Sequence, residues 1–324
     1  MVISEKKSNT IQILRGIAII AVVLIHNTPD GAPQIIIRPF LNFSVGLFLF
    51  LSGMLSNVDH WKPWKRIKKV LIPYLIWTVV YVILYHHNTP MQIPEYLIRE
   101  LLTGQASAAM YYIFVYIQLT LLIPLIDKLA KSKLKYLGFL ISPLEIIITR
   151  MLPRIMGYGL NEYVSIATSI SCLGWFSYFY FGYMLGNGLL RIDASKKKRY
   201  AALLVLGIIL QIAEGYWYYS MGSKNCGTQM KLSSVFTGCI FSILTYLLIE
   251  SERCKEIKLL HLLGDCSFGI YFSHLAVMYV LAAIPYYEKY VFFPINGIIT
   301  LTISFVLVMI SRQVLGKFSK YLGF

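Results

Sequence analysis

Charged residues are scarce in this chain. Only 14% of its 324 residues are Asp, Glu, Lys or Arg, whereas 57% are hydrophobic, and the mean hydropathy is +0.64. This balance excludes an ordinary soluble globular domain. A bilayer core about 30 Å thick needs roughly 20 apolar residues per helical span, and many such stretches follow one another here. We therefore expect a multi-pass protein of the cell membrane, in contact with membrane lipid.

Acidic residues and cysteine pairs are also few. Asp and Glu total 15 against 30 Lys and Arg, which gives a net charge of +15. In a soluble protein this excess would suggest nucleic acid, but the basic residues form short clusters between apolar stretches, a pattern typical of membrane orientation. We expect no nucleic-acid partner. The five cysteines form no C-x-x-C pair, so we expect free thiols and neither a disulfide framework nor a metal site.

The apolar stretches predict about ten transmembrane helices in one all-α domain covering residues 1–324. Their centres fall near residues 11–27, 36–56, 70–86, 110–126, 136–152, 166–187, 201–219, 233–249, 262–284 and 295–311. The N-terminal run lacks a small-residue cleavage site, so it is interpreted as a retained first span. The fifth stretch is interrupted by Pro143, Glu145 and Arg150, which the interior of a helix bundle can satisfy.

The distribution of basic residues predicts that both termini face the cytoplasm. With a cytoplasmic N-terminus, 23 of the 30 basic residues fall in inside segments and 7 in outside segments. Because an error of one span would exchange the charges of all later loops, this asymmetry supports both the count and the orientation.

Arg15 and His26 are the first candidates for chemistry. They lie eleven positions apart in the first span, which is about 1100° of rotation, or three turns plus roughly 20°, and a rise of about 16 Å. Both therefore share one helix face, with Arg15 toward the cytoplasm and His26 at or beyond mid-membrane. Ionisable groups at depth favour a functional interpretation. The alternative is an interfacial anchor at Arg15 and a helix-end histidine at His26, packed by Asn27 and Asp30.

A second candidate is the basic entry to the third span, residues 61–77, which reads WKPWKRIKKVLIPYLIW. Its lysines and arginine, with Trp61 and Trp64, suit an anionic ligand whose phosphates need several cations and whose ring can stack. The alternative is contact with lipid headgroups.

Several further polar residues fall within apolar stretches: Gln118, Glu145, Gln211, Glu214, Asp265 and His274. His274 would lie roughly 22 Å into a straight ninth span, a depth comparable to that of His26, so the two could face one cavity. It is equally compatible with a hydrogen-bonded packing role. Glu145 would orient a histidine or an acceptor hydroxyl. Alternatively, it would satisfy backbone groups freed by Pro143, and we favour this structural interpretation.

Five motifs occur in an order that resembles the membrane-bound acyltransferase family 3. They are LRGIAIIAVVLIH, NFSVGLFLFLSGML, the basic entry ending in IPYLIW, YFYFGYMLG and SFGIYFSHL. The resemblance covers essentially the whole chain. It implies transfer of an acyl group, often acetyl, from coenzyme A in the cytoplasm to a hydroxyl on the outer side, usually of a cell-envelope glycan.

The resemblance also implies residue roles. His26 would be the essential histidine, acting as a general base or an acyl relay, and Arg15 would contact the acyl donor. The family's paired-arginine motif falls on Arg66 and Lys69, so its second position is lysine here and a bidentate phosphate contact becomes a single ammonium. Lys65 would join the same acyl-donor site.

The fourth span departs from a second family element. Many members begin it with a His-Leu-Trp-Phe-like sequence, whereas this chain has Ala109, Met110, Tyr111 and Tyr112. Some members carry a Tyr-Tyr-x-Phe version, so Tyr111 is a candidate acceptor or support residue. The chain also lacks the additional domains fused to some relatives. It would work alone or as the membrane part of a larger protein, such as a serine-racemase resistance protein.

A thioester donor is already activated, so the expected reaction mainly needs a general base that makes the acceptor hydroxyl more nucleophilic. Histidine suits this task since its unperturbed pKa is near 6.5. Ser52 and Asn42 are candidate donors to the tetrahedral oxygen, and acceptor recognition falls to outer loops such as residues 87–109 and 153–165. The competing hypothesis is a transporter that exports a glycan or an amino acid without chemistry, although the inverted repeats common in transporters are absent.

Overall fold

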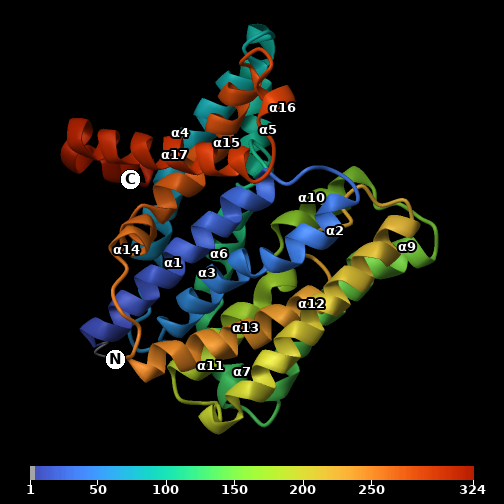
Figure 1. Ribbon diagram of the computed structural model, residues 1–324, viewed down its shortest axis with the longest axis vertical. Coiled ribbons are helices and arrows are strands. Elements are labelled where there is room, and N and C mark those ends of the chain that lie inside the picture. Colours follow the sequence, from blue (N-terminus) through green and yellow to red (C-terminus); the bar gives the residue numbers. More distant parts are fainter. Residues whose placement is uncertain (1–3) are drawn as a thin grey trace. The chain divides into compact units, whose positions relative to one another are not determined.

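The structure, a computed structural model, describes residues 4–324, and this part of the chain folds into helices without a β-strand (Figure 1). This part of the chain contains eight helices long and apolar enough to cross a membrane, and up to ten spans if each of two bent helix pairs counts as one more. The prediction of an all-α membrane protein with about ten spans is therefore confirmed at the upper count. The two bent pairs correspond to the predicted stretches 110–126 and 262–284.

The chain divides into two compact units. Unit 1 comprises Met1–Trp61, Leu122–Leu160 and Leu173–Asp265. Its described elements are α1 (Glu5–His26), α2 (Pro33–Ile37), η1 (Arg38–Phe40), α3 (Phe43–Met54), α7 (Ile123–Lys131), η3 (Lys135–Leu140), α8 (Ile141–Ile146), η4 (Ile147–Met151), α9 (Leu152–Ile155), η5 (Leu173–Trp175), α11 (Phe176–Gly186), η6 (Ala194–Lys196), α12 (Lys197–Ser220), α13 (Leu232–Ser251) and α14 (Lys258–Asp265).

Unit 2 comprises Lys62–Leu121, Asn161–Cys172 and Cys266–Phe324. Its elements are α4 (Pro63–His86), η2 (Pro90–Gln92), α5 (Ile93–Thr103), α6 (Tyr111–Leu121), α10 (Glu162–Ile170), α15 (Ser267–Ala282), α16 (Tyr287–Tyr290), α17 (Ile295–Leu315) and η7 (Gly316–Leu322). That the chain forms a single domain over residues 1–324 stays a prediction.

Glycines bring helices of unit 1 into close contact. A Cβ added to Gly182 or Gly186 of α11 would lie 2.0 Å from Phe50 O or 2.1 Å from Met54 O of α3, and one on Gly53 of α3 would lie 2.1 Å from Phe179 O. Small residues that let backbones approach are the usual means of helix association in lipid, where apolar burial adds little. The motifs GLFLFLSG and YFYFGYMLG therefore build one helix crossing.

Apolar side chains cover the outside of the long helices. On α12, Val205, Leu206, Ile209 and Leu210 are all exposed, at spacings that place them on one stripe of the helix. In water so large an apolar surface would be unusual, but facing lipid it is favourable. The core of unit 1 contains Leu14, Ala18, Leu47, Phe50 and Leu185 among its buried residues.

Proline accounts for one of the two bends. Helices α6 and α7 meet at an angle of 57°, and Pro124 occupies the first turn of α7, where it cannot donate a backbone hydrogen bond to the preceding turn. The segment Lys135–Ile155 passes through a π-helical turn, η4, between Pro143 and Pro153. This irregularity lies in the fifth stretch, where the sequence is interrupted.

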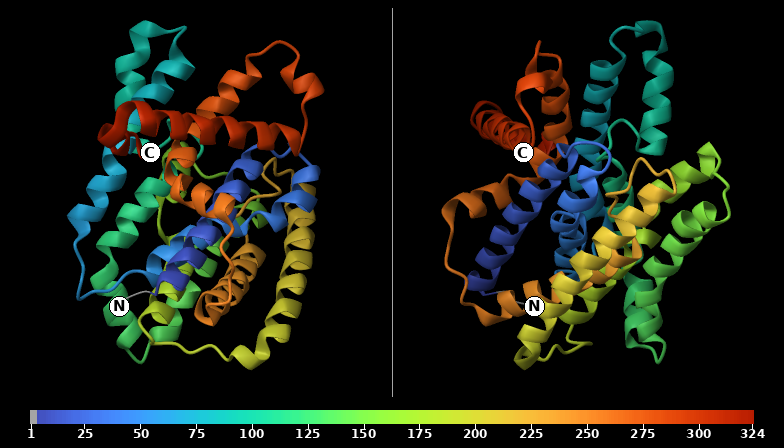
Figure 2. Two further views of the ribbon diagram at one scale, coloured as in Figure 1. Left: turned by 60° about the vertical axis from the view of Figure 1, so that its left-hand side comes forward. Right: turned by 45° about the vertical axis from the view of Figure 1, so that its right-hand side comes forward.

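In unit 2, α4 and α5 form a hairpin (Figure 2). Tyr74, near the middle of α4, donates its hydroxyl to the carbonyl oxygens of Glu100 (3.1 Å) and Leu101 (2.8 Å), in the last turn of α5. Helix α5 therefore returns along α4 to about half its length. The core of this unit is aromatic and includes Trp77, Tyr81 and Phe272.

Candidate active site

Arg15 lies where α1 crosses α14, in unit 1. The two helices approach through glycines, because a Cβ on Gly16 would lie 2.1 Å from Leu260 O and one on Gly264 would lie 2.1 Å from Gln12 O. The half-buried Arg15 donates through Nη1 to Gln12 Oε1 (3.3 Å). The close crossing thus fixes the helix turn that carries the guanidinium.

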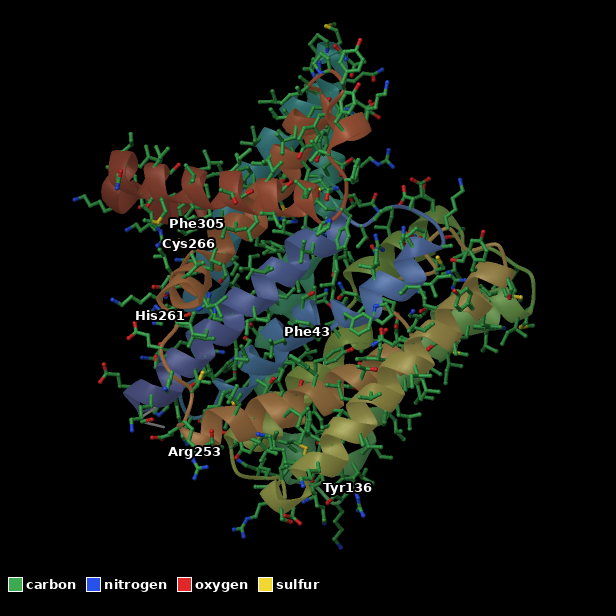
Figure 3. The ribbon with its side chains drawn as sticks, in the orientation of Figure 1. Phe43, Tyr136, Arg253, His261, Cys266 and Phe305 are labelled. Atoms are coloured by element: carbon green, nitrogen blue, oxygen red, sulfur yellow. The ribbon has the colours of Figure 1, made fainter. Side chains whose placement is uncertain are left out.

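A polar chain continues from Arg15 onto α14. Gln12 Nε2 donates to Asp265 Oδ1 (2.9 Å), and His261 Nδ1 lies 3.7 Å from Asp265 Oδ2; His261 is labelled in Figure 3. The Gln12 side-chain amide therefore links the Asp265 carboxylate of α14 to the Arg15 guanidinium of α1. Arg15 is therefore part of a side-chain network between two helices, which a simple lipid anchor would not require.

His26 is the last residue of α1 and is half-buried. The helix is continuous from Glu5, so Arg15 and His26 belong to one unbroken helix, as the spacing argument requires. The two residues suggested as packing partners for His26 are themselves held by hydrogen bonds. Asn27 Nδ2 donates to Val23 O (2.9 Å), and Asp30 Oδ1 accepts from Gln34 Nε2 (2.9 Å).

The two candidate hydrogen-bond donors of the second span, Asn42 and Ser52, make different contacts in unit 1. Asn42, just before α3, is buried, and its Nδ2 donates to Gln211 Oε1 (2.9 Å) and Gly227 O (3.4 Å). Ser52 is a half-buried residue of α3 whose carbonyl accepts from Ser56 Oγ (2.7 Å). Asn42 therefore has a clear structural role, and its donation to a reaction intermediate stays a prediction.

Glu145 is buried in α8 of unit 1. Its Oε1 and backbone carbonyl both accept from Thr149 Oγ1, at 3.0 and 2.9 Å. Its Oε2 makes no hydrogen bond and lies where a Cβ on Gly174 would approach within 2.8 Å. These contacts fit the structural interpretation of Glu145.

The basic entry of the third span forms the first turns of α4, in unit 2. Lys65 and Lys69 are exposed and Arg66 is half-buried. The spacings i, i+3 and i, i+4 place all three on neighbouring positions of one helix surface. Trp64 beside them exposes 69% of its surface. The turn thus offers several cations and an aromatic plane.

His274 is fully buried in α15 of unit 2. Its Nδ1 lies 3.0 Å from Ile270 O and 2.8 Å from Tyr271 O. Since a carbonyl accepts only, Nδ1 carries the proton. The assumption of a straight ninth span is wrong, because α14 and α15 meet at 76°, and the depth of roughly 22 Å derived from it does not hold.

Tyr111 is the first residue of α6 and is half-buried. The ring of its neighbour Tyr112 lies 5.6 Å from that of Tyr271, whose hydroxyl donates to Ala109 O. The tyrosines that replace the usual element of the fourth span are therefore part of the aromatic packing between α6 and α15.

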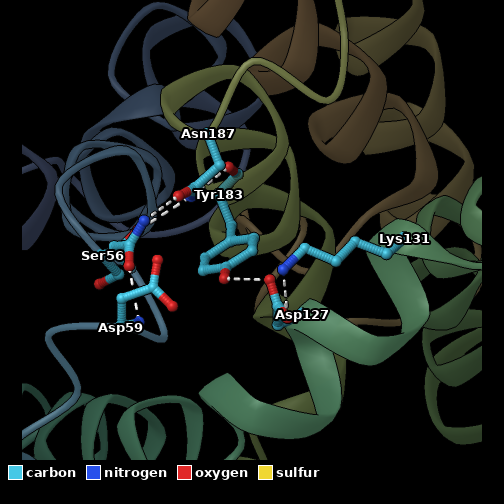
Figure 4. Close-up of polar contacts among 7 residues, drawn as sticks. Ser56, Asp59, Asp127, Lys131, Tyr183 and Asn187 are labelled. Carbon is cyan, nitrogen blue, oxygen red and sulfur yellow. Dashed lines mark hydrogen bonds and ion pairs between the residues drawn. The ribbon is translucent and has the colours of Figure 1, made fainter.

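A polar cluster that sequence reasoning missed lies near the ends of α3, α7 and α11 in unit 1 (Figure 4). Asp127 Oδ1 accepts from the Tyr183 hydroxyl (2.7 Å), and its Oδ2 pairs with Lys131 (2.8 Å). Asn187 Nδ2 donates to Ser56 O (2.9 Å). Only the i, i+4 spacing of Asp127 and Lys131 was visible in the sequence.

A cavity of about 400 Å³ lies nearby, lined by residues of α1, α3, α11 and α13. Lys7 pairs with Glu250 (2.8 Å) and Ser4 Oγ donates to Glu252 (2.9 Å) at its edge. Within residues 4–324 no group of three or more His, Cys, Asp or Glu side chains is arranged to hold a metal ion.

The described residues form an all-helical protein with helices suited to cross a membrane, a charged first span and a basic entry to α4. Comparison with protein families makes this specific, since the model of an acyltransferase domain matches residues 9–311. The chain therefore belongs to the membrane acyltransferase family 3. No curated protein matches the chain. No solved structure matches it either.

Proposed function

We propose that the protein transfers an acyl group, acetyl in the usual case, from cytoplasmic acyl-CoA to a hydroxyl of an extracytoplasmic acceptor, a glycan of the cell envelope. The observation that supports this most directly is α1, an unbroken helix from Glu5 to His26 that carries Arg15 in its middle and His26 at its end. Membership of an acyltransferase family gives the reaction type. The cell membrane is the location that follows.

His26 is the proposed general base. Its neutral imidazole takes the proton of the acceptor hydroxyl as that oxygen attacks the thioester carbonyl carbon. The tetrahedral intermediate then collapses, the carbon–sulfur bond breaks, and the coenzyme A thiolate leaves and takes up the proton from the imidazolium. A positioned base of this kind contributes about 10²–10⁴-fold in rate.

The test of this role is acyl transfer by purified protein. With acetyl-CoA and an envelope glycan fraction, His26→Ala should lower kcat by at least about 10²-fold and leave coenzyme A binding unchanged. His60→Ala, which removes an exposed histidine of the same unit, is the matched control. Binding without turnover for every acceptor, together with glycan export that does not depend on His26, would favour a transporter.

Arg66, Lys65 and Lys69 are the proposed ligands of the donor phosphates, and Trp64 is the proposed stacking partner of the adenine. Arg15 is proposed to contact the donor as well. Arg66 is half-buried, whereas Lys65 and Lys69 are exposed. Charge-assisted contacts with phosphate are strong and depend on salt.

Arg66→Ala and Arg15→Ala should each raise the Kd for coenzyme A by roughly tenfold, as expected for loss of one charged hydrogen bond. The remaining affinity should fall less steeply with salt. Lys317→Ala removes the same charge from an exposed position of η7 and should leave the Kd unchanged. Unchanged binding in both arginine variants would move the donor site elsewhere.

A further inference from the structure

Lys231 is a lysine with no exposed surface, at the position that precedes α13. Its ammonium donates to Gln211 O of α12 (3.0 Å) and to Cys226 O (3.3 Å) in the loop between α12 and α13. Burying a cation is costly unless its hydrogen bonds are made. Here they are made to backbone carbonyls, so Lys231 fastens the loop to α12.

Charged and titratable groups surround this ammonium. Burial and the charge of Arg38 in η1 disfavour the charged form of Lys231. They outweigh Glu214 of α12 and Cys226 of the loop, which favour it, so the pKa of Lys231 falls to about 8. Glu214 accepts from the backbone N of Leu232 (3.2 Å) and Ser233 (2.9 Å), and thereby caps the start of α13. The Glu214 carboxylate thus holds the start of α13 against α12, and the Lys231 ammonium holds the loop before α13 against α12.

The loop that Lys231 fastens lies on the segment that follows His26. Cys226 Sγ donates to Gly31 O (3.3 Å). Gly227 approaches so closely that a Cβ there would lie 2.6 Å from Gln34 Cβ and 2.7 Å from Arg38 Cδ. Its carbonyl also accepts from Asn42 Nδ2 (3.4 Å). The loop is thus in contact with the segment at four points.

The segment is in turn bound to the end of α1. Arg38 Nε donates to Thr28 Oγ1 (2.7 Å), and the Thr28 hydroxyl donates to Ile25 O (2.6 Å), the carbonyl of the residue before His26. A continuous path therefore runs from Lys231 to Cys226, along the backbone to Gly227, and then through Arg38 and Thr28 to the last turn of α1. All its members belong to unit 1.

We propose that Lys231 is a positioning residue for His26, because it holds the loop that packs on the segment joining His26 to α3. This inference rests on the proposed function. Its role in the reaction is indirect: without the clamp the loop is released, Arg38 loses its packing partner, and the last turn of α1 frays. The base is then present but spends less time at the acceptor.

The test compares Lys231→Met with Lys224→Met, which removes an exposed lysine from the same loop. Lys231→Met should lower kcat by tenfold or more and leave the KM for acetyl-CoA unchanged, since the donor's cations are in α4 and α1. Hydrogen exchange of peptides covering residues 24–42 should become at least tenfold faster in Lys231→Met. Lys224→Met should behave like the wild type in both measurements.

A second variant keeps the inference testable if Lys231→Met does not fold. Thr28→Val breaks the other end of the contact chain and should speed exchange in the same peptides and lower kcat. In the double variant the loss of kcat should be smaller than the product of the single losses, because both act through one segment. If Lys231→Met has the same kcat and the same hydrogen-exchange rates as the wild type, the inference is overturned. An inactive wild type whose exchange still depends on Lys231 would overturn the proposed function instead.

Discussion

The helix crossing of α3 and α11 permits a quantitative prediction. An alanine Cβ at Gly182 would lie 2.0 Å from Phe50 O, whereas real Cβ contacts essentially never fall below 3.0 Å. The two backbones must therefore separate by about 1 Å or more at this point. Overpacking of a close-packed interior costs about 1–3 kcal/mol, and the upper end applies because the obstructing atom is backbone and cannot rotate away.

Thermal unfolding of the detergent-purified protein, followed by intrinsic fluorescence at one scan rate, measures this cost. Gly182→Ala should lower Tm by about 5 °C or more, because each kcal/mol of lost stability lowers Tm by a few degrees in a chain of this size. Gly159→Ala is the matched control, because nothing lies within 4 Å of a Cβ added there. If the two variants melt at the same temperature, the close crossing does not exist as described.

Two further predictions concern buried polar groups. Tyr81→Phe removes the hydroxyl that donates to Phe272 O (2.6 Å) and accepts from Ala276 N (3.2 Å), so the variant should lose about 1 kcal/mol by thermal unfolding, whereas Tyr163→Phe, at an exposed tyrosine, should lose nothing measurable. The pKa of Lys231 is lowered from 10.5 to about 8 in the folded protein, so between these values the unfolded chain binds more protons and stability rises with pH. The stability of the wild type relative to Lys231→Met should therefore increase by up to about 3 kcal/mol from pH 7 to pH 10.5, as judged by Tm, and a constant difference would contradict the burial of a charged Lys231.

The membrane-spanning helices were predictable because lipid requires long apolar runs with internal hydrogen bonds. The stretch 201–219 corresponds to α12 and 233–249 to α13. The bend at Leu122 has a visible cause in Pro124, but the bend at Cys266 lies inside the apolar run 262–284 with no proline. Hydropathy records how apolar a run is and carries no information on its direction.

The candidate site was predictable only in part. Arg15 and His26 were found because eleven residues bring two ionisable groups to one helix face. Lys231 was only counted among the outside charges, because its burial depends on contacts with residues remote in the sequence, such as Gln211, and on a loop held by Cys226 and Gly227. The folding of residues 87–109, expected only as an outer loop, includes α5.

Helix α5 has a consequence for how the chain enters the membrane. With 11 residues it is too short to span a bilayer alone, which takes about 20, and its last carbonyls would be left without donors in hydrocarbon. Glu100 O already accepts from Gly104 N (2.9 Å), and the Tyr74 hydroxyl, in the middle of α4, supplies a donor to Leu101 O (2.8 Å). A nascent α5 would therefore be retained at membrane depth only after α4 has been inserted, so the insertion of this hairpin has a fixed order.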